Sequence, residues 1–201
     1  MRPFLIAGWL LLPVGAWAYH EGPGQDRIKL DAVDAELADA RKAATAGEWA
    51  LAAKHYDAAL AALPQLETGD VQRAAMRIRV SSAKAKLEGS KLIEAEKELE
   101  ALVDELAEMD ASYADLLEEA KEGHANTKFY ITWLMRLEGY QRSDWEPEIE
   151  SARQAYGRLA EQARARGDEQ RADEMLASLE SAIKLARLDL DELQGLPLPS
   201  Q

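Results

Sequence analysis

Residues 49–63 carry the sequence pattern that most restricts how this chain can fold. Apolar side chains recur there at the spacing of one helix face, namely Trp49, Ala52, Ala53, Tyr56, Ala59, Leu60 and Leu63. Gly47 precedes the stretch and Pro64 follows it, and both residue types end helices. A helical pair cannot bury such a face alone, so the pattern predicts helices that stack on neighbouring helices.

The run from Gly47 to Pro64 (GEWALAAKHYDAALAALP) resembles the second half of a tetratricopeptide repeat, through Gly47, Ala52, Tyr56, Ala59, Leu60 and Pro64. Two weaker units follow in the same register. Ala83 corresponds to Ala40, Ala95 to Ala52 and Leu99 to Tyr56, and a third unit repeats the spacing with Ala152, Tyr156, Leu159 and Ala160. The resemblance implies an all-α fold in which antiparallel helical hairpins stack as a short α-solenoid, closed by a C-terminal capping helix.

Turn residues divide the chain into expected helices over residues 31–46, 49–63, 70–87 and 91–109. Residues 112–137 are expected to form either one long helix or two helices broken near Gly123. We expect a loop over residues 139–145, a helix capped by Ser143 or Asp144, and a last helix from Gly167 to about Leu193.

The two ends of the sequence differ from the part between them. Residues 1–18 combine Arg2, a short apolar stretch and Ala16-Trp17-Ala18, a pattern typical of a secretory signal peptide cleaved after Ala18. We expect a flexible lead-in over residues 19–30, a helical domain over 31–194 and an irregular tail over 195–201. Because the chain has no cysteine, a bacterial periplasmic or secreted location is favoured over a disulfide-rich animal one.

Catalytic motifs are missing from the sequence. It holds no phosphate-binding glycine loop, nucleophile elbow or paired-histidine zinc motif, and His20, His55 and His124 share no ligand spacing. We therefore predict a protein that is not an enzyme, with no catalytic residue, cofactor or metal site. The net charge of −13 argues against nucleic acid as a partner, and no membrane insertion is expected after signal cleavage.

Charge is distributed unevenly. Residues 94–122 hold twelve acidic and two basic side chains, whereas residues 70–87 are rich in Lys and Arg. One interpretation is that these segments simply attract each other. The other is a basic groove that takes an acidic peptide or a C-terminal carboxylate, because the resemblance places Arg77, Val80 and Lys84 on the groove side, with Arg41 matching Lys84 and Lys128 as a further candidate.

Five aromatic side chains gather in a short segment, namely Phe129, Tyr130, Trp133, Tyr140 and Trp145. The sequence leaves open whether they form a core cluster or an exposed binding surface. Together these features predict an exported scaffold or adaptor that binds proteins or peptides in the bacterial periplasm or envelope. The alternatives are a periplasmic holdase chaperone and a binder of a small molecule or metal.

Overall fold

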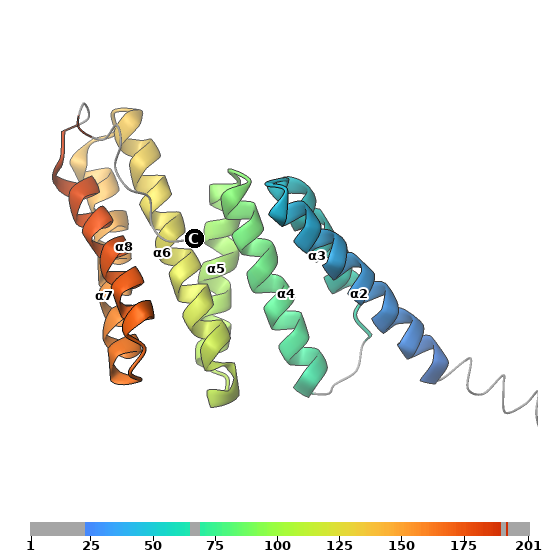
Figure 1. Cartoon of the computed structure of the whole chain (residues 1–201). Coiled ribbons are helices and arrows are strands. Elements are labelled where there is room, and N and C mark those ends of the chain that lie inside the picture. The colour runs from blue at the N-terminus through green and yellow to red at the C-terminus, as the bar shows by residue number, and fades with distance from the viewer. Residues whose placement is uncertain (1–22, 65–68, 190–191, 193–201) are drawn as a thin grey trace, which may run out of the picture. The chain divides into compact units, whose positions relative to one another are not determined.

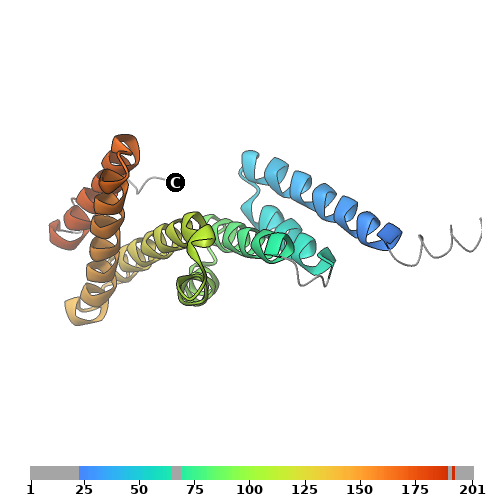
Figure 2. The same cartoon turned by 90° about the horizontal axis from the view of Figure 1, so that it is seen from below.

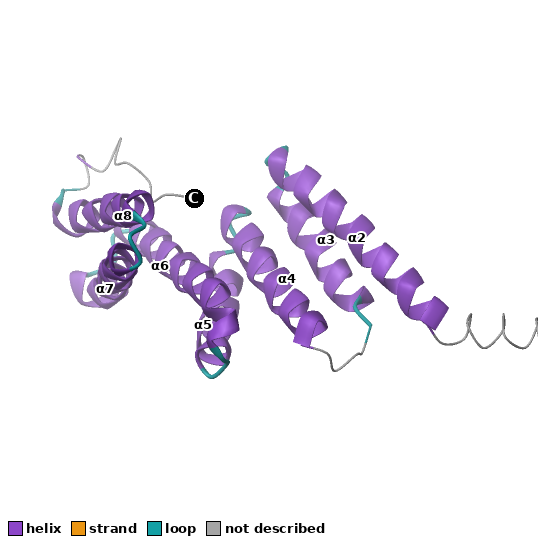
Figure 3. Cartoon of the chain, turned by 60° about the horizontal axis from the view of Figure 1, so that its bottom comes forward, coloured by secondary structure: helices purple, strands orange, loops and turns teal. Residues whose placement is uncertain are grey.

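The computed structural model describes residues 23–64, 69–189 and 192, and side chains from residue 28 onward. Within these residues the chain consists of helices joined by short turns and contains no strand (Figure 3), so the expected all-α class is confirmed. The elements are α2 (Pro23–Thr45), α3 (Trp49–Ala62), α4 (Gly69–Glu88), α5 (Leu92–Ala107), the 3-10 turn η1 (Ala111–Tyr113), α6 (Ala114–Leu137), α7 (Arg142–Ala165) and α8 (Glu169–Arg187).

The chain divides into two compact units, Met1–Ile78 and Arg79–Gln201, with the boundary inside α4. In the first unit α2 packs along α3. Its core is formed by Val33, Ala59 and Ile78, and the half-buried side chains of Leu37, Tyr56, Leu60, Ala62 and Leu63 pack against it.

In the second unit each helix from α5 to α8 packs against the next one along the chain (Figures 1 and 2). The apolar core of α6, α7 and α8 is built around Phe129, Ile149, Tyr156, Met175 and Leu185. The hydroxyl group of Tyr156 donates a hydrogen bond of 2.7 Å to the side-chain oxygen of Asn126 on α6. Because Tyr156 is fully buried, this bond satisfies a polar group that water does not reach.

Most of the turns between helices share one geometry. Gly47, Gly139 and Gly167 all have positive φ, and in each turn the next N–H bonds back to a carbonyl five residues earlier, as in Tyr140 to Met135 at 2.9 Å. This is the Schellman ending of a helix. Ser90 occupies the corresponding position after α4 with φ 62°, and the Lys91 N–H bonds to the Lys86 carbonyl at 2.9 Å.

Three sequence expectations about helix boundaries were wrong. The predicted loop over residues 139–145 is short, because the turn at Gly139 closes α6 within two residues and α7 already begins at Arg142. Gln141, not Ser143 or Asp144, is the N-cap of α7. The lead-in predicted for residues 19–30 is helical from Pro23 onward, since proline is compatible with the first position of a helix. Ile28 and Leu30 are nevertheless exposed there, which agrees with the sequence of residues 19–30, where apolar residues do not recur at helical spacing.

The alternative of a single helix over the Gly123 region is confirmed, since α6 runs unbroken through that residue. The first 22 residues lie outside the described part, so the signal peptide over 1–18 stays a prediction, as does the tail over 195–201. None of the helices among the described residues has the length and apolar character needed to cross a membrane.

Candidate functional site

The residues predicted to form a basic groove do not all lie at the surface. Val80 is completely buried, so it is a core residue and its assignment to a groove wall was wrong. Lys84 forms an ion pair of 2.9 Å with Glu119. Arg41 and Arg77 are exposed in the first unit, and their role in a groove stays a prediction.

Lys128 lies between two carboxylates, 2.6 Å from Glu148 on α7 and 3.2 Å from Glu96 on α5. Burial lowers the pKa of Lys128, but the hydrogen bonds to Glu148 and Glu96 more than offset this and raise it overall. Its positive charge therefore joins three helices of this protein.

Ion pairs also link the basic half of α4 to the acidic segment after it. Arg79 lies 2.6 Å from Glu105, and Lys86 lies 2.8 Å from Glu98. These contacts confirm the interpretation that the two segments attract each other. Each partly exposed pair contributes only about 0–1 kcal/mol to stability, so the pairs orient the helices more than they hold them.

The aromatic cluster is partly core and partly surface. Phe129 and Trp145 are buried, Tyr130 and Trp133 are half-buried against the same core, and Tyr140 is 51% exposed. The Arg136 guanidinium lies 5.0 Å from the ring centroid of Trp145, which favours a cation–π contact. Phe129 and Trp145 therefore belong to the core, Tyr140 lies at the surface, and Tyr130 and Trp133 are intermediate.

One hollow lies where α4 ends, α5 begins and α6 ends, and all three ends lie at the upper side of the second unit in Figure 1. We call it the apolar notch; it has a volume of about 350 Å³ and is lined by Leu87, Glu88, Ser90, Leu92, Tyr130, Trp133 and Leu134. Leu137 is 54% exposed one turn beyond Leu134, on the same face of α6. Ile93, next to Leu92, is 71% exposed. Large apolar side chains that remain exposed beside a hollow are typical of interaction sites.

Glu88 is the charged residue of the apolar notch. Its carboxylate is half-buried, and among the described residues it has no hydrogen bond or ion pair. Burial raises the pKa of Glu88, and the positive charge of Lys84 partly opposes that rise. Lys84 itself pairs with Glu119. The notch thus combines an apolar lining with a carboxylate that has no direct cationic partner.

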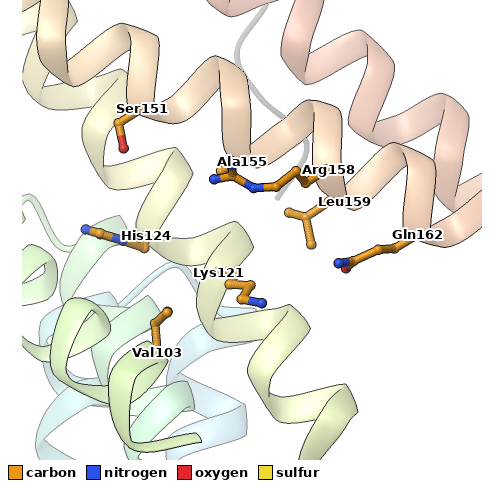
Figure 4. Close-up of a pocket in the computed structure, with 8 residues that line it drawn as sticks. All are labelled: Val103, Lys121, His124, Ser151, Ala155, Arg158, Leu159 and Gln162. Carbon is orange, nitrogen blue, oxygen red and sulfur yellow. The ribbon is translucent and has the colours of Figure 1, made fainter. Parts of the chain in front are cut away.

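A second hollow lies between α5, α6 and α7, with a volume of about 150 Å³. We call it the cationic pocket. Arg158, Leu159 and Gln162 project from α7 toward α6, where Lys121 and His124 lie, and Val103 closes it from α5 (Figure 4). Its lining contains no carboxylate, although the chain has 37 acidic residues against 24 basic ones.

His124 contributes an imidazole ring to the cationic pocket. Its Nε2 atom is buried and has no hydrogen-bond partner among the described residues. Burial lowers the pKa of His124, and the cation of Lys128 lowers it further, while Glu100, Glu96 and Glu148 act in the opposite direction. The ring is therefore neutral near pH 7, because its ordinary pKa is about 6.5.

Comparisons with known proteins add nothing to this geometry. No family model, curated protein or solved structure matches this chain. The tetratricopeptide resemblance of Gly47–Pro64 therefore stays a prediction. In the part of the chain that the structure describes, no group of three or more His, Asp or Glu side chains is placed to hold a metal ion.

Both hollows use residues that sequence reasoning missed. Lys121 and Arg158 lie 37 positions apart in the sequence, and only the packing of α7 on α6 brings them to one pocket. The aromatic segment of the sequence already included Trp133 and Tyr130. In contrast, no sequence pattern marks Leu87, Glu88 and Leu92 as binding residues; the sequence indicates only that they lie where one helix ends and the next begins.

Proposed function

We propose that this protein is an exported adaptor that binds a basic, amphipathic helix of a partner protein in the apolar notch. The apolar start and the Ala16-Trp17-Ala18 site of the sequence support export to the periplasm or envelope. The single observation that carries the proposal is the half-buried, unpaired carboxylate of Glu88 in a hollow whose other lining residues, apart from Ser90, are aliphatic or aromatic.

The notch provides anchoring contacts for apolar side chains. Its volume of about 350 Å³ is enough for one or two large side chains from a helix laid across it, which is a common way to recognise an amphipathic helix. Trp133 and Tyr130 present ring surface with a centroid distance of 6.4 Å. Aromatic side chains in such positions contribute most of the binding energy at many interfaces.

Charge complementarity selects a basic partner. A half-buried carboxylate loses hydration, and a Lys or Arg side chain placed against it restores a favourable interaction. The net charge of −13 attracts basic partners over longer range. The acidic partner expected from the sequence has less support at this end of the molecule, because Lys84 is already paired with Glu119.

A peptide-display selection tests this proposal. Random helical peptides would be selected on the wild-type protein and, in parallel, on the Leu134→Asp variant, which places a charge in the apolar lining. We expect wild-type selection to enrich peptides with Leu, Phe or Met anchors and a Lys or Arg about one helical turn away. The Leu134→Asp variant should lose this enrichment, since it buries an unpaired charge under the peptide.

The control is Leu51→Asp, which changes a leucine that is exposed in the first unit and outside the notch. It should leave the enriched set unchanged. Enrichment of many apolar peptides without a basic residue would contradict the adaptor and favour the alternative of a holdase chaperone. The same peptide set with wild type and Leu134→Asp would place binding outside the notch.

A further inference from the structure

Beyond the proposed function, we propose that the cationic pocket between α5, α6 and α7 binds a carboxylate carried on a short apolar stem. Lys121 and Arg158 would hold the carboxylate group, and Val103, Ala155 and Leu159 would contact the stem. This site uses none of the residues that line the apolar notch.

The two cations of the cationic pocket have no partner in the described part of the chain: neither Lys121 nor Arg158 forms an ion pair or a hydrogen bond there. Ten other Lys and Arg side chains of the second unit form ion pairs with Asp or Glu. Lys97, Arg164 and Arg187 form none either, but they are exposed and line neither hollow. In a protein with an excess of carboxylates, two unpaired cations over one hollow indicate an anion that comes from outside the chain.

The lining of the cationic pocket combines polar and apolar side chains. Ser151 and Gln162 add neutral hydrogen-bonding groups, and the guanidinium of Arg158 matches the planar, two-oxygen geometry of a carboxylate. Val103, Ala155 and Leu159 give the hollow an apolar side. A ligand that is anionic throughout would leave this side without contacts, whereas a short hydrocarbon stem fills it.

The volume of the cationic pocket limits the size of its ligand. A cavity of about 150 Å³ accepts a benzene-sized molecule of about six non-hydrogen atoms, and the pocket has this volume. A carboxylate with a stem of about three carbons meets that limit. Such a group is found in small organic acids and at the C-terminal residue of a peptide, and both sources share the same recognition chemistry.

Acidic groups also lie near the pocket. Glu96, Glu100 and Glu148 act on His124, but Lys128 pairs with Glu96 and Glu148. Lys121 and Arg158, the two cations of the lining, have no ion pair among the described residues, so they are the groups that would take the carboxylate. The neutral ring of His124 contributes a hydrogen bond or apolar contact without adding charge.

Titrations followed by amide NMR of the full, 15N-labelled chain test the proposal. The probes are butyrate, its neutral isostere butyramide, inorganic phosphate, and N-acetyl-alanine as a mimic of a peptide C-terminus whose carboxylate, Cα and Cβ stay within the limit of about six atoms. We expect butyrate to shift the amide signals of residues 121, 151 and 158 in a saturable way, with a Kd of about 1 mM as befits so few atoms. Butyramide should give no saturable shift.

The variant pair isolates the two cations. Lys121→Gln with Arg158→Gln should weaken butyrate binding by about tenfold or more, because it removes both charges that face the ligand. The matched control is Lys97→Gln with Arg164→Gln, which removes the same charge from exposed positions of α5 and α7 outside the pocket, and it should leave binding unchanged. The comparison of butyrate with butyramide uses the wild-type protein, so it tests whether the pocket needs a charged ligand even if a variant folds poorly.

Each outcome has one meaning. Binding of N-acetyl-alanine at least as tight as that of butyrate supports the site with a peptide C-terminus as its source, and tighter binding of butyrate supports it with a free small acid. Absence of saturable butyrate binding, equal binding of butyramide, phosphate binding as tight as that of butyrate, or an unaffected Lys121→Gln/Arg158→Gln variant would each overturn the proposal. Leu134→Asp should leave butyrate binding intact, because Leu134 does not line the cationic pocket. A failure of the peptide-binding proposal for the apolar notch can therefore be distinguished from a failure of the carboxylate-binding proposal.

Discussion

Ser90 is the one described residue other than glycine that has a positive φ. Left-handed backbone costs a residue with a Cβ about 1–2 kcal/mol relative to glycine, although glycine also increases the entropy of the unfolded chain. The side chain is exposed, and the three equivalent turns use Gly47, Gly139 and Gly167. The backbone conformation at position 90 therefore favours glycine, whereas the sequence has serine there.

We predict that Ser90→Gly raises the free energy of unfolding by about 0.5–1 kcal/mol, measured by urea unfolding followed by circular dichroism. The reverse change at an equivalent turn, Gly139→Ser, should lower it by about 1 kcal/mol, because a Cβ at Gly139 meets nothing within 4 Å and only the backbone conformation is strained. Destabilisation by Ser90→Gly would show that the Ser90 side chain contributes more than its φ costs.

At the scale of the helices, two glycines in helix interiors differ in how closely other helices approach them. A Cβ on Gly123 of α6 would lie 3.2 Å from a methyl group of Leu99 on α5 and 3.5 Å from Cγ of Lys84 on α4. Gly123 thus allows three helices to approach closely. A Cβ on Gly157 of α7 would meet nothing within 4 Å, so that glycine only lowers helix propensity.

Gly157→Ala should therefore stabilise the protein by about 0.5–1 kcal/mol through helix propensity. Gly123→Val should destabilise it by about 1–3 kcal/mol, because the fully buried Leu99 has to move. Thermal and urea unfolding of both variants measure the two effects. Equal stabilities for wild type and Gly123→Val would mean that α5 and α6 are not in close contact at this point.

The sequence predicted core faces well, because apolar periodicity directly reports which side of a helix is buried. Ala52, Ala95 and Ala152, placed at equivalent positions by their spacing, all have no exposed surface. Boundaries were less predictable. The loop over residues 139–145 was overestimated because a glycine in left-handed conformation reverses the chain in very few residues.

Neither hollow could be predicted, because each depends on how helices that are distant in sequence cross one another. Val103, Lys121 and Arg158 come from three different helices and share no sequence motif. Lys84 and Lys128 carry the positive charge that a basic groove would need. The sequence alone does not reveal that Glu119 lies against Lys84, or that Glu96 and Glu148 lie against Lys128.

At the scale of the whole molecule, a net charge of −13 coexists with ion pairs that use most of the Lys and Arg side chains of the second unit. Each of the two hollows is lined by charge that has no ion pair among the described residues. This charge is the carboxylate of Glu88 in the apolar notch, and Lys121 with Arg158 in the cationic pocket. At the notch, we propose that Glu88 selects the charge of a helical partner.

Charge reversal at Glu88 tests whether this carboxylate selects the partner's charge. The display selection would be repeated on Glu88→Lys, with Glu138→Lys as a control of equal charge change at an exposed position of α6's end outside the notch lining. We predict that Glu88→Lys keeps the apolar anchors in the selected peptides but replaces the basic residue by Asp or Glu, while Glu138→Lys keeps the basic residue. Enrichment of the same basic peptides by Glu88→Lys and wild type would contradict the account.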